Sequence, residues 1–183
     1  MLRIVEAPRL ASLTSLHLGG RALALAAFES AADLEALPEA ARRIGGRITP
    51  LGGGTNILAA DGELPFLLVR CGIGGVTEET GEGGGTRLIR VGAGMKLPRL
   101  LTWCMKRGLS GLEGMAGVPG DVGGAVAGNA GAHGVDMGTV LRGVEVFTPD
   151  RGLRMLGRDE VRCAYRSFGL KDDGAPWFLI TGA

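Results

Sequence analysis

The pair Tyr165-Arg166 has the clearest potential for catalysis in this sequence. Arginine is a permanent cation with a fixed fork of N–H donors, which suits a carboxylate or an enolate that develops during a reaction. Tyr165 is the single tyrosine of the chain. The competing interpretation is an arginine in a surface salt bridge beside a core tyrosine. The pair alone leaves both interpretations open.

A first glycine-rich turn, Gly52-Gly53-Gly54-Thr55-Asn56, follows a predicted strand over residues 47–51. Its backbone amides can converge on an anion, and Thr55 and Asn56 add hydroxyl and amide donors, which suits a pyrophosphate. The turn matches neither GxxxxGK[ST] nor GxGxxG, so it indicates neither a P-loop NTPase nor a Rossmann fold. A purely structural turn between two strands stays open.

A second glycine-rich run extends from Gly111 to Gly134. Its triplet spacing of glycine breaks at Gly124, which excludes collagen, and its interspersed Leu, Met and Val residues are unusual for a flexible linker. Because glycine permits positive φ and lacks the Cβ that would hold a ligand away, the run predicts a ligand loop or a tight structural turn. Together with the first turn, it favours one elongated ligand, such as a dinucleotide, gripped from both sides.

Composition narrows the function classes. The net charge of +1 lacks the clustered basic face of a nucleic-acid-binding protein, and no apolar run approaches the length of a membrane span. Three widely spaced cysteines predict reduced thiols in a cytoplasmic protein, and the two histidines have no ligand partners nearby, so we expect no metal site. No obligate protein partner is evident. Only 4% of the residues are aromatic, so a bound cofactor would help to stabilise the small-residue core.

Periodicity and turn residues predict an α+β fold. The predicted strands cover residues 21–28, 47–51, 66–70, 76–80, 87–91, 143–148, 153–156 and 177–181. The helical segment over 31–43, with Ser30 as its N-cap, should form two short pieces or a kinked helix, because Pro38 lies inside it. A second helix over 98–106 should pack the following residues inward: Leu97, Leu100, Leu101, Cys104 and Met105. Asp159 should cap a short helical turn ahead of Tyr165.

Four segments, taken in order, resemble the FAD-binding half of the UDP-N-acetylenolpyruvoylglucosamine reductases, also called UDP-N-acetylmuramate dehydrogenases. They are residues 13–20, 51–56, 108–134 and 165–171, and the third is highly specific. The resemblance implies an FAD-binding fold of the vanillyl-alcohol oxidase (PCMH) type. Its two α+β subdomains would be residues 1–75 and 76–183, with the cofactor between them. The C-terminal substrate-binding domain of that family would be absent, which would leave the strand over 177–181 with an uncovered, adhesive edge.

The resemblance also implies an activity. In this flavoprotein oxidoreductase family, FAD takes a hydride from NADPH and passes it to the enolpyruvyl group of a nucleotide sugar, in cytoplasmic peptidoglycan synthesis for cell-wall biogenesis, cell shape and cell division. Arg166 would stabilise the enolate-like intermediate, with Tyr165 beside it. We expect the 183-residue chain alone to lack turnover. A stand-alone FAD-binding or electron-transfer module is the alternative.

Three residues depart from the family pattern. Phe168 and Gly169 alter the segment before Lys171, and His133 stands where a tyrosine is common. The roles of Lys171 and His133 are therefore open. The predicted cofactor-binding residues come from the two glycine-rich loops and the last strand. They are Gly52, Gly53, Gly54, Thr55, Asn56, Ile57, Gly117, Val118, Pro119, Gly120, Gly123, Gly124, Ala125, Asn129, Gly131, Ala132, Gly134 and Ile180.

Overall fold

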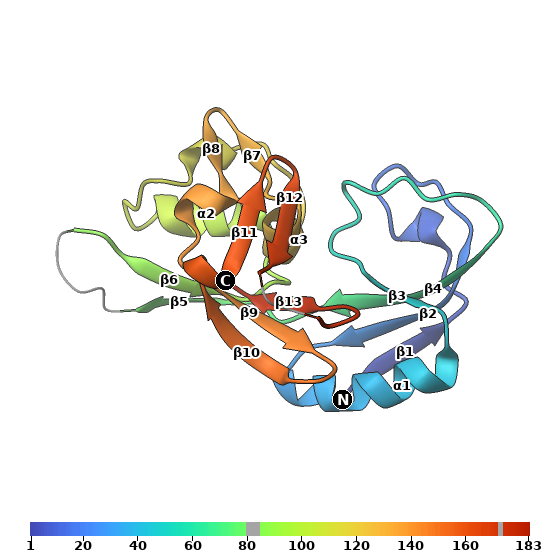
Figure 1. Cartoon of the computed structure of the whole chain (residues 1–183). Coiled ribbons are helices and arrows are strands. Elements are labelled where there is room, and N and C mark those ends of the chain that lie inside the picture. Colours follow the sequence, from blue (N-terminus) through green and yellow to red (C-terminus); the bar gives the residue numbers. More distant parts are fainter. Residues whose placement is uncertain (80–84, 172–173) are drawn as a thin grey trace.

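The computed structural model of the chain describes residues 1–79, 85–171 and 174–183. A four-stranded mixed sheet of order β1-β2-β4-β3 occupies one side of the molecule (Figure 1). Its strands are β1 (Arg3–Glu6), β2 (Arg21–Phe28), β3 (Arg47–Pro50) and β4 (Glu63–Cys71). β1 runs antiparallel to β2, whereas β2 and β3 both run parallel to β4. The predicted strands over 21–28, 47–51 and 66–70 are thus present.

The alternation of side chains along β2 explains why both faces of this sheet are covered. Ala24, Ala26 and Phe28 pack on the face that carries the 3-10 helix η2 (Ala31–Ala36) and the helix α1 (Leu37–Ile44). Leu25 belongs to a separate apolar cluster beneath the loops of residues 10–13 and 51–59. The sheet is therefore a rigid base for the Gly52–Asn56 turn, which follows β3 directly.

The predicted break in the first helix is confirmed. Pro38 stands in the first turn of α1, where its missing N–H is tolerated, and Gly45 ends the helix with φ of 75°. Ser30 and Asp33 form a capping box ahead of η2. The Asp33 carboxylate accepts hydrogen bonds from the N-terminal ammonium and from the Glu29 amide, which lowers its pKa to about 2.

Apart from η1 (Leu10–Ser12), which packs on the first sheet, the remaining elements form the second side of the molecule and the smaller hairpins. The helical ones are α2 (Leu97–Met105), η3 (Glu113–Met115), α3 (Val122–Ala127), α4 (Met137–Val140) and η4 (Arg158–Glu160). The strands are β5 (Val76–Glu79), β6 (Leu88–Val91), β7 (Gly131–Ala132), β8 (Val135–Asp136), β9 (Gly143–Thr148), β10 (Gly152–Gly157), β11 (Val161–Ala164), β12 (Ser167–Leu170) and β13 (Leu179–Gly182). Helices and strands therefore mix as an α+β fold.

A second apolar core lies between α2, α3 and the sheet of order β10-β9-β13. The helix over 98–106 is confirmed as α2, and Leu97, Leu100 and Cys104 are buried in this core. The prediction for Met105 is wrong, since its side chain is 71% exposed. Met105 is the last residue of α2, one position beyond Cys104, and it turns away from the inward face.

The prediction of an uncovered edge is also wrong for the end of the last strand. β13 pairs with β9 on one side, and on the other side it exchanges backbone hydrogen bonds with residues 91–93. Ala93 donates to the Thr181 carbonyl at 2.9 Å, and Val91 and Ala183 donate to each other's carbonyls at 2.7 and 2.9 Å. The end of β13, at Thr181 and Gly182, is thus paired on both sides, in the middle of the molecule (Figure 1).

Several elements differ from the sequence-based expectation. The predicted strands over 76–80 and 87–91 are present as the hairpin of β5 and β6, while residues 80–84 lie outside the described residues, as do Asp172 and Asp173. The short turn η4 begins after Gly157, so Asp159 lies inside it and does not cap it. β1, α3, α4 and the hairpins β7–β8 and β11–β12 were not expected. None of the described helices is long and apolar enough to cross a membrane.

Candidate functional site

A cavity of about 920 Å³ opens where β3, α3 and β13 face one another. This volume lies in the range of roughly 300–1,000 Å³ that is usual for small-molecule pockets. Four predicted cofactor-binding residues line it, namely Gly52, Gly123, Gly124 and Ile180. The structure thus places parts of both glycine-rich loops and the last strand around one space.

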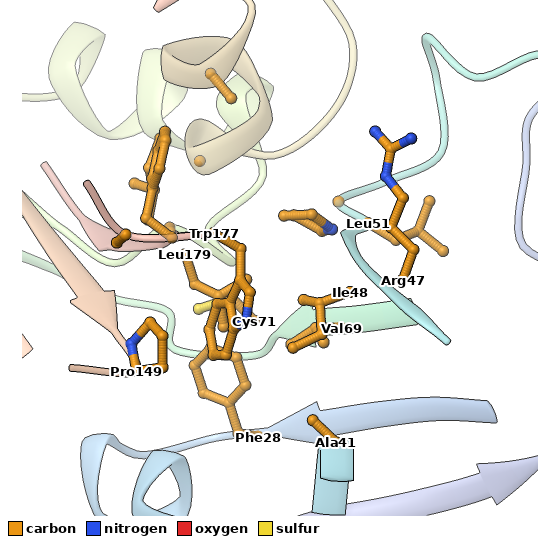
Figure 2. A pocket seen from close by; sticks show the side chains of 18 of the residues that line it. Phe28, Ala41, Arg47, Ile48, Leu51, Val69, Cys71, Pro149, Trp177 and Leu179 are labelled. Carbon is orange, nitrogen blue, oxygen red and sulfur yellow. The ribbon is translucent and has the colours of Figure 1, made fainter. Parts of the chain in front are cut away.

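The walls of this cavity come from segments far apart in the sequence. Figure 2 shows Arg47 and Ile48 of β3 on one side, and Pro149 and Trp177 on the other. Cys71 also lines the cavity, and burial raises the pKa of its thiol to about 11, so the thiol stays protonated near neutral pH. Most of the residues that line the cavity are apolar, and cationic or polar groups stand at a few places.

The two glycine-rich loops touch each other. A Cβ added to Gly53 would lie 3.3 Å from the Gly120 Cα atom, and a Cβ added to Gly120 would lie 2.8 Å from the Thr55 hydroxyl oxygen. Gly120 also has a positive φ of 104°, which L side chains rarely adopt. The two loops are thus in direct contact, and their binding of one shared ligand stays a prediction.

A charged pair lies at this contact. The Lys96 Nζ atom donates to the Asp121 Oδ1 atom at 2.5 Å, and the Asp121 side chain is only 7% exposed. Asp121 itself lines the cavity. Sequence reasoning missed both residues, although Asp121 stands inside the glycine-rich run between Gly120 and Gly123.

A second, smaller hollow of about 320 Å³ lies beside the β7–β8 and β11–β12 hairpins. It is lined by Tyr165 and Arg166 together with Gly131, Ala132, Gly134 and the unassigned His133. Tyr165 is 91% exposed, so it is no core tyrosine, and no carboxylate of the described residues forms an ion pair with Arg166. The salt-bridge interpretation of this pair therefore has no support among the described residues.

Asn129 links the second glycine-rich run to the Tyr165-Arg166 turn. Its Oδ1 atom accepts from the Gly138 amide at 2.8 Å, and its Nδ2 atom donates to the Ala164 carbonyl at 3.0 Å. The residue is only 6% exposed. The Asn129 side chain is therefore engaged within the protein, where it fixes the residue that precedes Tyr165.

Residues with a strained backbone conformation line the same hollow. Among the described residues, the non-glycine positions with positive φ are Ala7, His17, Asn129, His133 and Arg166. The last three, with φ of 39°, 49° and 54°, all line the smaller hollow. Such conformations cost about 1–3 kcal/mol each and concentrate at functional sites.

The other predicted residues lie outside both hollows. Ala125 is buried in the second core, Val118 packs against that core, and Ile57 packs under the first sheet. Asn56 and Pro119 are exposed, as is Gly117, which has φ of 86°. Gly54 is closely packed, since an added Cβ would lie 2.1 Å from the Leu13 carbonyl oxygen. These residues shape the two loops, and their contact with a cofactor stays a prediction.

Most of the residues that sequence reasoning missed line the larger cavity. Arg47, Cys71 and Trp177 carry no motif, and only the folded sheet order brings them to one place. One usable signal existed, since the chain has only two tryptophans and Trp177 sits beside Pro176, in front of an apolar strand. Among the described residues, no group of three His, Cys, Asp or Glu side chains gathers as a metal site.

Comparisons with known proteins identify the cofactor class. The FAD binding domain family matches residues 22–154. The UDP-N-acetylenolpyruvoylglucosamine reductase of Nitratidesulfovibrio vulgaris is 50% identical over 183 residues, which cover 100% of this chain and 62% of that protein. The reductase of Oleidesulfovibrio alaskensis is 44% identical over 179 residues, or 97% of this chain and 60% of that protein. The chain thus spans about three fifths of the length of these relatives.

Solved structures agree on the fold. The crystal structure of the Thermus caldophilus reductase MurB is 32% identical, with a TM-score of 0.77, and the match covers 100% of this chain and 61% of that one. A solvent-stable cholesterol oxidase is 17% identical, with a TM-score of 0.66 over 87% of this chain and 34% of its own, which shows the fold alone. The predicted FAD-binding fold of the vanillyl-alcohol oxidase type is thereby confirmed. The chain belongs to the FAD binding domain family and corresponds to the FAD-binding portion of the UDP-N-acetylenolpyruvoylglucosamine reductases.

Proposed function

We propose that this chain is the FAD-binding part of a UDP-N-acetylmuramate dehydrogenase. This enzyme would reduce the enolpyruvyl group of a UDP-N-acetylglucosamine derivative with NADPH in cytoplasmic peptidoglycan synthesis. The observation that carries the proposal is the contact between Gly53 and Gly120, since it joins the two glycine-rich loops beside one large cavity. The 50% identity to the N. vulgaris reductase supports the choice within the flavin-binding fold.

The residues around the larger cavity fit part of an elongated dinucleotide. An added Cβ at Gly124 would meet nothing within 4 Å, so a ligand can approach its backbone closely, and the apolar walls suit a planar ring. We assign Gly52, Gly123, Gly124 and Ile180 to direct cofactor contact on this ground. The division into residues 1–75 and 76–183 and the contact of the remaining loop residues are part of the same proposal.

Bound FAD would supply the hydride chemistry, and the protein would supply position and charge. We propose that Arg166 stabilises the negative charge that develops on the substrate carboxylate and enol oxygen. Its guanidinium is a fixed cation on the rim of the smaller hollow, and Tyr165 lies beside it, with the guanidinium carbon 5.9 Å from the ring centroid. Donors aimed at developing charge are the largest single contribution in many enzymes.

FAD binding is tested by titrating the flavin-free chain with FAD while recording the visible spectrum and the tryptophan fluorescence. We expect saturable binding and quenching of Trp177, which lines the larger cavity. The Trp103→Phe variant isolates that signal, because the chain has only two tryptophans. A chain that is folded by circular dichroism and binds no FAD would refute the proposal.

Turnover separates this proposal from a stand-alone FAD-binding or electron-transfer module. Because the chain spans 62% of the N. vulgaris relative, we propose that the 183 residues bind FAD but do not complete the reduction. A chimera that joins residues 1–183 to the rest of that relative should oxidise NADPH in the presence of the enolpyruvyl nucleotide sugar. A chimera that binds FAD and remains inactive would favour the stand-alone module.

A further inference from the structure

The segments of residues 95–97 and 120–122 cross as a short antiparallel pair beside the first glycine-rich turn. Leu97 donates to the Gly120 carbonyl at 2.9 Å, and Val122 donates to the Met95 carbonyl at 2.8 Å. Lys96 and Asp121 are therefore direct partners across this pair. Side chains of directly opposed residues lie on the same face, which explains why these two meet.

The pair stands over the Gly52-Gly53 turn. A Cβ added to Gly53 would lie 3.4 Å from the Lys96 Nζ atom and 3.5 Å from the Asp121 Oδ1 atom. A Cβ added to Gly52 would lie 3.5 Å from the Asp121 Oδ2 atom. The two charges are thus in contact with the turn whose amides are the candidate pyrophosphate site.

The two members of the pair differ in exposure. The Asp121 side chain is 7% exposed, whereas the Lys96 side chain is 53% exposed. An ammonium carries three N–H donors, and among the described residues the hydrogen bond to Asp121 uses one of them. The cation can therefore reach a ligand while the buried carboxylate holds it in place.

The positive charge of Lys96 balances the negative charge of Asp121 at the cavity wall. A carboxylate on the cavity wall repels an anionic ligand, and the Lys96 ammonium compensates for it at 2.5 Å. We propose that Lys96 binds the diphosphate of the cofactor and that Asp121 positions it. This inference rests on the proposed FAD binding and assigns one further residue to it. The simpler interpretation is a salt bridge that only joins the two loops, and the experiment below separates the two.

The experiment compares FAD dissociation constants of the full chain and its variants at two salt concentrations. Lys96→Met should weaken FAD binding by about tenfold or more, because it removes a charged donor and leaves Asp121 uncompensated beside two phosphates. It should also reduce the salt dependence of the affinity. The double variant Lys96→Met with Asp121→Asn should bind FAD more tightly than Lys96→Met alone.

Two control variants keep the inference falsifiable. Lys96→Arg retains the cation and should stay within about threefold of the unmodified chain. Lys106→Met removes an exposed lysine at the other end of α2 and should leave the affinity unchanged. Affinity of Lys96→Met within twofold of the unmodified chain, or no recovery in the double variant, would overturn the role of Lys96. An unmodified chain that binds no FAD would instead refute the proposed function.

Discussion

Arg166 combines two properties that point to a role beyond solubility. Its backbone has a φ of 54°, in a region that L residues rarely adopt. The residue is exposed, and among the described residues its guanidinium lies beside an aromatic ring and forms no ion pair with a carboxylate. A surface arginine selected only for charge needs no strained backbone, so the conformation favours a site that requires this side chain in one direction.

The role of Arg166 is testable in the chimera with the N. vulgaris reductase. Arg166→Lys keeps the charge and loses the planar fork, so we expect kcat to fall by about 10²–10³-fold, the usual effect of removing one oxyanion donor. The affinity for FAD should stay close to that of the unmodified chimera, because the substitution retains the cation. Arg162→Lys, at an exposed position of β11, is the matched control. Equal kcat values for the two variants would remove Arg166 from the mechanism.

The sequence predicted candidate residues better than it predicted their roles. The glycine-rich loops and the pair Tyr165-Arg166 stand out by composition alone. The role of Asn129 could not be read in this way, because its side-chain amide can serve a ligand or the protein equally well. Only the fold shows that it bonds to the Gly138 amide and the Ala164 carbonyl. Side-chain donors in a glycine-rich run therefore need three-dimensional context before they are assigned to a ligand.

At the scale of the elements, the glycine-rich composition of α3 did not predict a helix. Glycine disfavours helix by about 1 kcal/mol per residue relative to alanine, so a helix that contains Gly123 and Gly124 is unexpected from propensity. Packing explains why it forms. An added Cβ at Gly123 would lie 2.8 Å from the Ala93 Cβ atom, so the helix approaches this neighbouring segment more closely than any side chain permits.

Alanine substitutions at these two glycines should have opposite effects on stability. Gly123→Ala should destabilise the chain by about 1–3 kcal/mol, because the new methyl group overlaps Ala93. Gly124→Ala should stabilise it by about 0.5–1 kcal/mol, because its added Cβ meets nothing within 4 Å and alanine favours helix. Urea unfolding measures both values. Equal destabilisation by the two substitutions would contradict the close approach of α3 to Ala93.

Elements with a strong local signal were predicted well, and the rest depended on tertiary contacts. The apolar run over residues 21–28 predicted β2, and the proline at position 38 predicted the break in the helix. The β11–β12 hairpin was missed because its turn residues Tyr165 and Arg166 lack the glycine or asparagine typical of such turns. The uncovered edge predicted for β13 was wrong because pairing with residues 91–93 is a long-range contact that no local pattern reveals.

At the scale of the whole molecule, the two apolar cores are linked through β9 and β13. Phe147 and Leu179 come from the second half of the chain, yet both are buried in the cluster that covers the first sheet and α1. The neighbouring residues Val144 and Val146 belong to the other core. Two adjacent strands thus contribute side chains to both cores, and we expect the halves to unfold together.

The two tryptophans can test this coupling because they report on different cores. Trp103 packs against the core around α2 and α3, and Trp177 packs against the core of the first sheet. With Trp177→Phe and Trp103→Phe as backgrounds, the denaturation midpoints of the two signals should coincide. Two well-separated midpoints would instead mean that the halves fold independently.

The Phe147→Ala substitution sharpens the test. It should lower stability by about 3–5 kcal/mol and shift the midpoints of both tryptophan signals together, because the two halves unfold as one unit. Val144→Ala, buried in the second core, should also shift both midpoints together, and by less, because a valine side chain leaves a smaller cavity. A shift confined to the signal of the substituted core would contradict the coupling of the halves.

The central position of β13 has a consequence for synthesis in the cell. The first sheet is complete at Cys71, but its core lacks Leu179 until about a hundred further residues have left the ribosome. At a synthesis rate of ~5–20 residues per second, part of the apolar face of the first sheet stays exposed to solvent for roughly 5–20 s. Chaperone occupancy should therefore be highest on this intermediate, and the flavin would join only after translation has passed the last strand.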